Sequence, residues 1–281
     1  MRITITGAGG LIGTKLTAAL QQRGDEVTGL SLRGGGPVPT DKLEGRDAVV
    51  HLAGENVAQR WTAEARKRIR ESREEGTRRL VEAIAATEVR PRALISASAV
   101  GYYGPHGEEI VDEDTPPGDD FLAQVCVAWE REALKARDLR VVLVRTGVVL
   151  DKSGGALGKM LLPFKLGAGG PVAGGGQYMP WIHVEDVVGI YLAALDGDWE
   201  GPVNATAPEP VTNKAFSRAL GRALHRPAIA PIPGFAIGLL YGEMAQIVTQ
   251  GQRAIPRRTV QLGFEYRHPG LDEALRDALK G

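Results

Sequence analysis

The segment ITITGAGGLIG, residues 3–13, constrains the fold of this chain more than any other stretch. An apolar, β-branched run leads directly into glycines at positions 7, 10 and 13, and an amphipathic helix pattern follows. Gly7 permits a tight turn, Gly10 lets the backbone approach a pyrophosphate at the helix N-terminus, and Gly13 allows close packing of helix on strand. A glycine-rich turn alone is weak evidence, but its place between a strand and a helix favours a dinucleotide site over a structural turn.

The rest of the chain repeats this alternation of short apolar runs and longer helical patterns. Strand-like runs occur at RITIT, EVTGLSL, DAVVHLAG, RALISAS and RVVLVRTGVVL, with helical patterns between them. Strands that are apolar nearly throughout are typical of a parallel sheet covered on both faces. We therefore predict an α/β fold with a Rossmann-type, doubly wound parallel sheet over residues 1–228. A small, mainly helical C-terminal domain, which serves as a substrate or cap region, would follow over residues 229–281.

The end of the second predicted strand indicates which dinucleotide binds. A site for NAD places Asp or Glu there, where the carboxylate accepts a hydrogen bond from the ribose hydroxyl. This chain instead has Ser31 and Arg33, and its nearest acids precede the strand. An arginine suits the 2′-phosphate of NADP, and the carboxylate that would repel that phosphate is missing. The sequence therefore predicts NADP(H), with a hydrated loop residue as the alternative reading of Arg33.

Composition and charge exclude several classes of function. The chain has 34 Lys and Arg residues and 34 Asp and Glu residues, so its zero net charge gives no general attraction to nucleic acid or a charged membrane. A single cysteine, Cys126, excludes an internal disulfide framework. No signal-peptide pattern opens the sequence, and the late apolar stretch GFAIGLLYG is too short to span a bilayer. We predict a cytoplasmic protein in which this stretch either covers the cleft or forms a homodimer face.

Several further motifs carry a family resemblance along nearly the whole chain. They are HLAGENV, RWTAEARKRIRESREEGTR, SASAVGYYGP, DDFLAQVCVAWE, RTGVVLDKSGGAL, PWIHVEDVV, NATAPEPVTN and IPRRTVQLGFEY. In this order they resemble the extended short-chain dehydrogenase/reductases, and more narrowly the atypical branch called epimerase family proteins. That branch ends in a small C-terminal domain of unknown function. The resemblance implies a Rossmann-type fold, a nicotinamide dinucleotide and a small-molecule substrate.

The same resemblance implies cofactor contacts beyond the three glycines. The end of the DAVVHLAG strand would flank the cofactor, and the residue after RTGV would approach the nicotinamide ring. An arginine in RKRIRESREE would reach the phosphates or the ribose, although such a mixed-charge helix face is also typical of a hydrated surface. The implied contacts are Thr6, Leu11, Ile12, Leu52, Ala53, Gly54, Arg73 and Val149.

The catalytic pattern of the superfamily is broken in this chain. Its ordinary enzymes carry Tyr-x-x-x-Lys on the helix before RVVLVRTG, where the lysine helps the tyrosine to exchange a proton at neutral pH. Here that helix reads DDFLAQVCVAWEREA, with Leu122 and Cys126 at the two positions. Residues 166–186 also lack the arginine with which relatives that act on nucleotide sugars grip the diphosphate. A smaller or more apolar substrate fits better with Tyr178 and Trp181.

Three hydroxyls of SASAVGYYG remain as candidates for the chemistry. Ser98 would hold the substrate oxygen, and Tyr102 or Tyr103 would act as proton donor. On this interpretation the chain is an NADP(H)-dependent oxidoreductase or epimerase with an atypical active site. The alternative is an NADP(H)-binding regulatory or redox-sensing protein without turnover, and the missing Tyr-Lys pair is the reason to keep it.

One further group invites a metal or acid–base interpretation. His183 precedes Glu185 and Asp186, but this spacing does not match a known zinc ligand set. We expect Asp186 to cap the helix VVGIYLAAL, and we predict no metal site.

Overall fold

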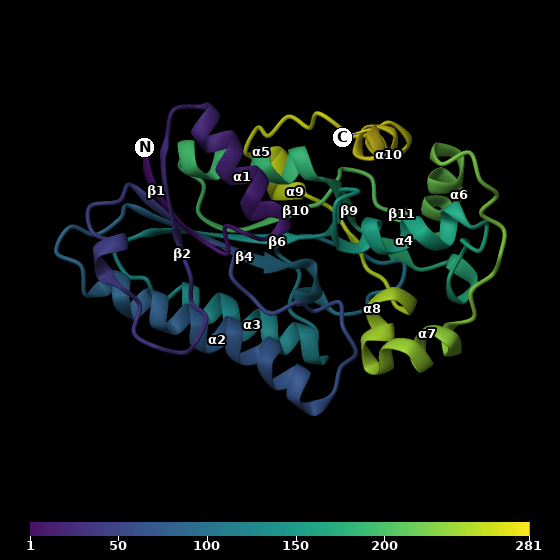
Figure 1. Ribbon diagram of the computed structural model, residues 1–281, viewed down its shortest axis with the longest axis horizontal. Coiled ribbons are helices and arrows are strands. Elements are labelled where there is room, and N and C mark those ends of the chain that lie inside the picture. The colour runs from purple at the N-terminus through teal and green to yellow at the C-terminus, as the bar shows by residue number, and fades with distance from the viewer. Residues whose placement is uncertain (281) are drawn as a thin grey trace.

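Six parallel strands form the central sheet of the computed structural model, which describes residues 1–280 (Figure 1). Their order across the sheet is β10-β6-β4-β3-β1-β2. Since β1 lies between β2 and β3, the direction of winding reverses there, and the crevice at such a reversal is where open α/β sheets bind ligands. The strands are β1 (Arg2–Thr6), β2 (Glu26–Leu30), β3 (Ala48–His51), β4 (Ala93–Ala99), β6 (Arg140–Thr146) and β10 (Gly201–Ala205).

Helices cover both faces of this sheet. In Figure 1, α1 (Leu11–Gln22) and α5 (Val184–Asp196) lie on one side, and α2 (Ala63–Ala85) and α3 (Phe121–Ala133) lie on the other. One buried cluster joins the sheet to the α1 side and a second joins it to the α2 side. The predicted α/β, doubly wound architecture is confirmed.

Smaller elements form the end of the molecule away from the N-terminus (Figure 1). A third buried cluster, which includes Leu157, Trp181, Phe216 and Leu275, holds several of them together. The short strands are β5 (Ile110–Val111), β7 (Val148–Leu150), β8 (Tyr178–Met179), β9 (Trp181–His183), β11 (Val211–Thr212) and β12 (Arg253–Ala254). The α-helices are α4 (Gly155–Lys165), α6 (Asn213–Ala223), α7 (Gly234–Tyr241), α8 (Ala245–Thr249), α9 (Arg257–Gln261) and α10 (Leu271–Lys280), and the 3₁₀ turns are η1 (Thr40–Lys42), η2 (Val100–Tyr103), η3 (Ala173–Gly175) and η4 (Gly242–Met244).

The C-terminal residues, from 229 onward, pack against several separate parts of the chain. β12 pairs in parallel with β5, and α10 contributes Leu275 to the cluster that contains Phe216 of α6. The Thr259 hydroxyl donates to the carbonyl oxygen of Asn204 in β10. The segment that we predicted to be a separate small domain is therefore in contact with the Rossmann-type part along much of its length.

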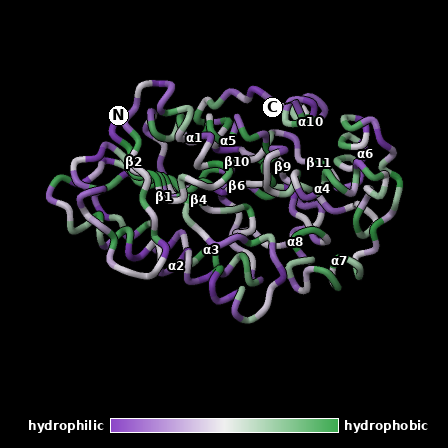
Figure 2. Tube along the Cα trace, in the orientation of Figure 1, coloured by the Kyte–Doolittle hydropathy of each residue, from purple (hydrophilic) through white to green (hydrophobic). Residues whose placement is uncertain are grey.

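Helix α7 exposes an apolar surface. Figure 2 shows its hydrophobic character, and none of its residues is buried. Phe235 and Leu239 are 80% and 75% exposed. Across residues 1–280, no helix combines the length and the apolar character that crossing a membrane requires.

Candidate functional site

The glycine loop has the geometry of a phosphate cradle. Gly7 has a φ of +72°, and a Cβ atom there would lie 2.8 Å from the backbone nitrogen of Ala53. A Cβ atom on Gly13 would lie 2.3 Å from the carbonyl oxygen of Gly7, so neither position accepts a side chain. Gly10 is the N-cap of helix α1, which has no side-chain cap and no acid in its first turn. Its first amide groups and the positive end of its dipole therefore suit a pyrophosphate.

Beside this loop, the end of β1 is fixed by a buried histidine. The Thr6 hydroxyl lies 2.6 Å from His51 Nδ1 and accepts a hydrogen bond from the backbone N–H of Ala53 at 3.3 Å. The Thr77 hydroxyl of α2 lies 2.8 Å from His51 Nε2. Thr6, Leu52, Ala53 and the glycine loop thus lie together at the carboxyl ends of β1 and β3, as the cofactor prediction requires.

The loop after β2 presents the predicted specificity residues to solvent. Ser31 and Arg33 are exposed, and the backbone N–H of Arg33 donates to the Ser31 hydroxyl at 3.3 Å. Arg79 of α2 holds both ends of this loop, since it donates to the carbonyl oxygens of Gly36 and Leu32 at 2.7 and 3.0 Å. The Arg33 guanidinium has no ion-pair partner within residues 1–280, so its charge is available to a phosphate.

Arg73 and Val149 each have contacts within the protein. Arg73 donates to the carbonyl oxygens of Glu55 and Ile69, and its guanidinium lies 5.0 Å from the Trp129 ring centroid. Burial lowers the pKa of Arg73, which indicates that this cation is poorly hydrated. Val149 packs against the core of the sheet, while its neighbour Val148 lines the cleft described next. Their predicted roles as cofactor contacts stay predictions.

A cleft of about 300 Å³ lies at the carboxyl ends of β4 and β6. Residues 99–101 and 146–148 form its floor, α3 and α4 line it, and α8 with the residues up to Gln252 closes it. Its apolar walls include Trp61, Phe121, Leu122, Val125, Met160, Met179 and Ile247. In parallel α/β folds the reacting end of a cofactor lies at this edge of the sheet. This is the candidate substrate site.

The two positions of the usual Tyr-Lys pair line this cleft without supplying a proton relay. Leu122 and Cys126 both lie in the lining, and α3 contains neither tyrosine nor lysine. Burial raises the pKa of the Cys126 thiol to about 12. The thiol therefore stays protonated at neutral pH, and its electrically neutral side chain acts as part of the apolar wall.

Ser98 and Tyr103 belong to a buried polar network instead of to the cleft. The Ser98 hydroxyl donates to Glu130 Oε1 at 2.6 Å, and Arg145 binds both oxygens of the same carboxylate at 2.8 Å. The Tyr103 hydroxyl donates to Asn204 Oδ1 at 2.7 Å and accepts from Arg145 at 3.1 Å. Burial raises the pKa of Tyr103 well above its ordinary value.

Side-chain alternation along β4 explains the placement of Ser98. Successive residues of a strand point to opposite faces, so Ala99 lines the cleft while Ser98 faces Glu130 on α3. The Arg145 guanidinium lies 3.5 Å from the ring centroid of Tyr102, which does not line the cleft. The structure thus brings the three predicted catalytic residues together, with Ser98 and Tyr103 committed to other polar partners. Their catalytic role stays an untested prediction.

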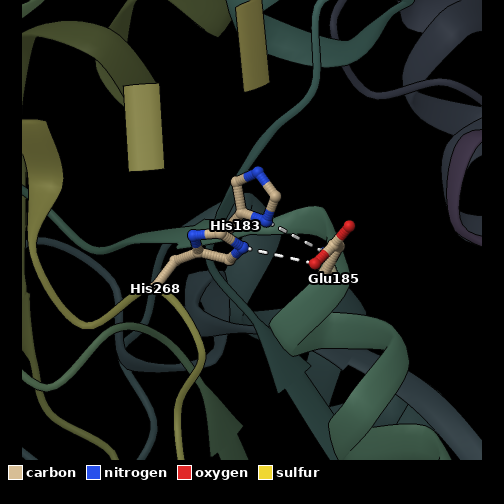
Figure 3. A group of neighbouring side chains, drawn as sticks. All are labelled: His183, Glu185 and His268. Atoms are coloured by element: carbon tan, nitrogen blue, oxygen red, sulfur yellow. Dashed lines mark hydrogen bonds and ion pairs between the residues drawn. The ribbon is translucent and has the colours of Figure 1, made fainter. Parts of the chain in front are cut away.

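His183, Glu185 and His268 form a second polar cluster (Figure 3). Ligand atoms from the three side chains lie within 4.8 Å of one another. However, the two imidazole rings lie against each other, with centroids 3.9 Å apart and planes tilted by 46°. His183 Nδ1 also accepts the backbone N–H of Glu185 at 3.2 Å. The geometry favours a structural contact between α5 and the C-terminal segment.

The expectation that Asp186 caps α5 was wrong. The cap is His183, and Asp186 occupies the first turn of the helix. The Asp186 carboxylate accepts the backbone N–H groups of Arg267 and His268 at 2.8 and 3.1 Å. Its side chain turns toward the C-terminal segment and accepts from two successive amides there. No local pattern signals this contact, because the partners are about eighty positions apart.

Comparison with known proteins identifies the family. The model of the NAD dependent epimerase/dehydratase family matches residues 3–205, and a domain of unknown function, DUF1731, matches residues 232–278. This chain belongs to the NAD-dependent epimerase/dehydratase family. The predicted family resemblance is confirmed, and the DUF1731 match falls within the predicted C-terminal segment.

Individual members of the family are similar over the full length. The epimerase family protein SDR39U1 of Bos taurus is 42% identical over 293 residues, which cover 99% of this chain and 100% of that protein. The crystal structure of human SDR39U1 isoform 2 with NADPH superposes with a TM-score of 0.93 at 40% identity and covers both chains completely. A nucleoside-diphosphate sugar epimerase from Corynebacterium glutamicum has a TM-score of 0.80 at 35% identity and covers 99% of this chain and 58% of that one.

Proposed function

We propose that this chain is an NADP(H)-dependent oxidoreductase that acts on a neutral, largely apolar carbonyl or hydroxyl compound. The observation that carries the proposal is the apolar cleft at the carboxyl ends of β4 and β6, beside a glycine loop shaped for a pyrophosphate. When bound there, the cofactor supplies or accepts a hydride. The protein's own residues then have to orient the substrate, exclude water and exchange one proton.

The preference for NADP(H) rests on Arg33. Its exposed guanidinium follows β2, where family members that use NAD carry an acid, and Arg79 holds the loop that bears it. The structure of human SDR39U1, which is similar along its whole length, contains NADPH. We propose that Arg33 and Ser31 bind the 2′-phosphate, and that the glycine loop, Leu52, Ala53 and Gly54 flank the rest of the cofactor.

The substrate class follows from the charges at the cleft. Arg73 is the lining cation, and it is already committed to two backbone carbonyls and to the Trp129 ring. Asp120 is committed to the cap of α3. Within residues 1–280 the lining therefore offers no unpaired cation to a diphosphate, whereas its aromatic and aliphatic walls suit an apolar body. A nucleotide sugar, the substrate named for the relative from Corynebacterium glutamicum, fits these walls poorly.

A second candidate function is an NADP(H)-binding protein without turnover. It is favoured by α3, which lacks the Tyr-Lys pair, and by the buried hydrogen bonds of Ser98 and Tyr103. Both candidate functions are compatible with a cytoplasmic location and with a homodimer formed through α7. Size-exclusion chromatography of a variant with Leu239→Asp tests the dimer, which would dissociate on this change because Leu239 is exposed.

The first experiment separates cofactor choice from activity. NADPH and NADH are titrated by nucleotide fluorescence against the wild type, Arg33→Ala and the neighbouring-helix control Arg78→Ala. Loss of charge-assisted hydrogen bonds to the phosphate should weaken NADPH roughly 10- to 100-fold in Arg33→Ala and leave NADH unchanged. Equal affinity of the wild type for the two nucleotides would remove the argument from Arg33.

The second experiment asks whether the protein turns over. Benzaldehyde, acetophenone and phenanthrenequinone are tested for oxidation of NADPH, followed by the loss of nicotinamide absorbance. Oxidation of NADPH that depends on one of these carbonyl compounds supports the oxidoreductase. Tight NADPH binding without oxidation by any of them, and by a wider set of aldehydes and ketones, would favour the second candidate.

A further inference from the structure

Tyr178 belongs to the lining of the cleft and carries a phenol hydroxyl. It lies on β8 and is the tyrosine found among the lining residues within the described range, 1–280. Its ring is half-buried, and its hydroxyl has no hydrogen-bond partner in that part of the chain. Tyr102 and Tyr103 differ in this respect, because neither of them lines the cleft. Tyr178 is therefore free to bond to a ligand.

Arg253 on β12 lies beside this phenol. Its guanidinium carbon is 5.1 Å from the centroid of the Tyr178 ring. Its Nε atom is buried without a hydrogen-bond partner, and no carboxylate of residues 1–280 pairs with it. Arg145 under Tyr102 provides the contrast, since Glu130 neutralises that cation with two bonds. A half-buried cation without an anionic partner destabilises the folded protein. Such groups are found preferentially at functional sites.

The segments that carry the two residues are held tightly together. A Cβ atom on Gly251 would lie 2.1 Å from the carbonyl oxygen of Tyr178, so the two backbones are in direct contact. Gln177 donates to the carbonyl oxygen of Val248 at 2.8 Å, and Gln252 donates to that of Val100, just after β4, at 2.7 Å. Tyr178 and Arg253 are thereby fixed relative to the floor of the cleft.

We propose that Tyr178 and Arg253 take the place of the Tyr-Lys pair that α3 lacks, an inference that rests on the proposed oxidoreductase function. In carbonyl reduction, the hydride of NADPH forms the new C–H bond and the C=O π electrons move to oxygen. That oxygen takes the proton of the Tyr178 hydroxyl, and the phenolate regains a proton from water. The Arg253 charge stabilises the phenolate through the face of its ring, as a cation near a developing anion does. Tyr178 is the catalytic residue and Arg253 is a positioning and electrostatic residue.

Steady-state kinetics on the NADPH-loaded protein test the pair. With any carbonyl compound of the three that the wild type reduces, Tyr178→Phe should lower kcat about 100-fold or more, because a general acid is lost. The Kd for NADPH should not change. Arg253→Met should lower kcat in the same direction, and Arg253→Lys should restore most of it. The double variant should be no slower than Tyr178→Phe, because the arginine acts through the phenol. Tyr266→Phe is the matched control and should keep wild-type kcat, because Tyr266 is outside the cleft lining.

A binding measurement gives a readout that does not need turnover. Acetophenone should quench the fluorescence of Trp61 and Trp129, which line the cleft. Loss of one hydrogen bond should weaken its affinity about 2- to 10-fold in Tyr178→Phe, but not in Tyr266→Phe.

The outcomes separate the failure of the inference from the failure of the function. Turnover by the wild type that persists in Tyr178→Phe overturns the inference alone, and its loss in Tyr102→Phe would assign the proton to Tyr102. An acetophenone affinity unchanged in Tyr178→Phe also counts against the placement of the phenol. A wild type that binds NADPH and reduces no carbonyl compound rejects the oxidoreductase function, and the proton-donor role falls with it.

Discussion

His51 shows how a single residue makes the cofactor end of the sheet sensitive to acid. It is fully buried between the Thr6 and Thr77 hydroxyls, beside the glycine loop. Burial, assisted by the nearby charge of Arg73, lowers its pKa from 6.5 to about 3. The neutral imidazole exchanges hydrogen bonds with both hydroxyls, whereas the charged ring has no water to hydrate it.

The free energy of unfolding should therefore fall in acid. The pKa of His51 is lower in the folded chain, so the unfolded chain takes up the proton first. The contribution is complete above the unfolded pKa near 6.5 and is lost as the pH falls from there toward about 3. At about pH 5 the loss should reach about 2 kcal/mol relative to neutral pH. Urea unfolding at both pH values measures it.

The control for this prediction is a histidine on the protein surface. His51→Gln should reduce the pH dependence of unfolding, whereas His225→Gln, at an exposed position, should leave it as in the wild type. His183, whose pKa is lowered by burial and by His268, contributes in the same sense and accounts for part of what remains. A pH dependence that is the same in His51→Gln and the wild type would contradict the assignment.

At the scale of elements, α3 is attached to the sheet by charge as well as by apolar packing. Glu130 of α3 and Arg145 of β6 are both nearly inaccessible to water and form a bidentate pair. The Ser98 hydroxyl of β4 completes the contact. Because two strands and one helix share this carboxylate, the cleft-facing side of α3 has a fixed position over the floor.

Breaking this pair should destabilise the protein strongly. Arg145→Met leaves the Glu130 carboxylate buried without its cation, which costs about 3–5 kcal/mol. Arg222→Met provides the control, since its ion pair with Asp272 has both side chains about 60% exposed. That change should cost no more than about 1 kcal/mol. Denaturant unfolding of the two variants gives the comparison, and equal losses would show that the buried pair has no special weight.

At the scale of the whole molecule, the C-terminal segment is part of one packed unit. Leu275 of α10 is fully buried in the cluster that contains Phe216 and Trp181, and Leu279 on the same helix is only partly buried. Leu275→Ala should therefore cost about 2–5 kcal/mol, and Leu279→Ala clearly less. Unfolding should remain one transition by circular dichroism and by tryptophan fluorescence. Two separated transitions would show instead that residues from 229 onward unfold as an independent domain.

The distance along the chain between contacting residues explains which features could be predicted from sequence. The glycine loop, the parallel sheet and the atypical α3 depend on residues that are close in the chain. Their patterns can therefore be recognised in the sequence. The side of β4 on which Ser98 lies depends on a one-residue register, which reverses the face of every side chain. The partners of Asp186 and the approach of Arg253 to Tyr178 depend on contacts between residues about 75–80 positions apart. No local pattern in the sequence encodes them.

The parallel pairing of β12 with β5 also has a consequence for synthesis. The glycine loop and the first strands are synthesised before Gly251, Gln252 and Arg253. The nascent chain can therefore form its nucleotide site while one wall of the cleft has not yet been made. A nascent chain arrested before residue 250 would have the glycine loop but would lack Gln250, Gly251 and Gln252, which close the cleft.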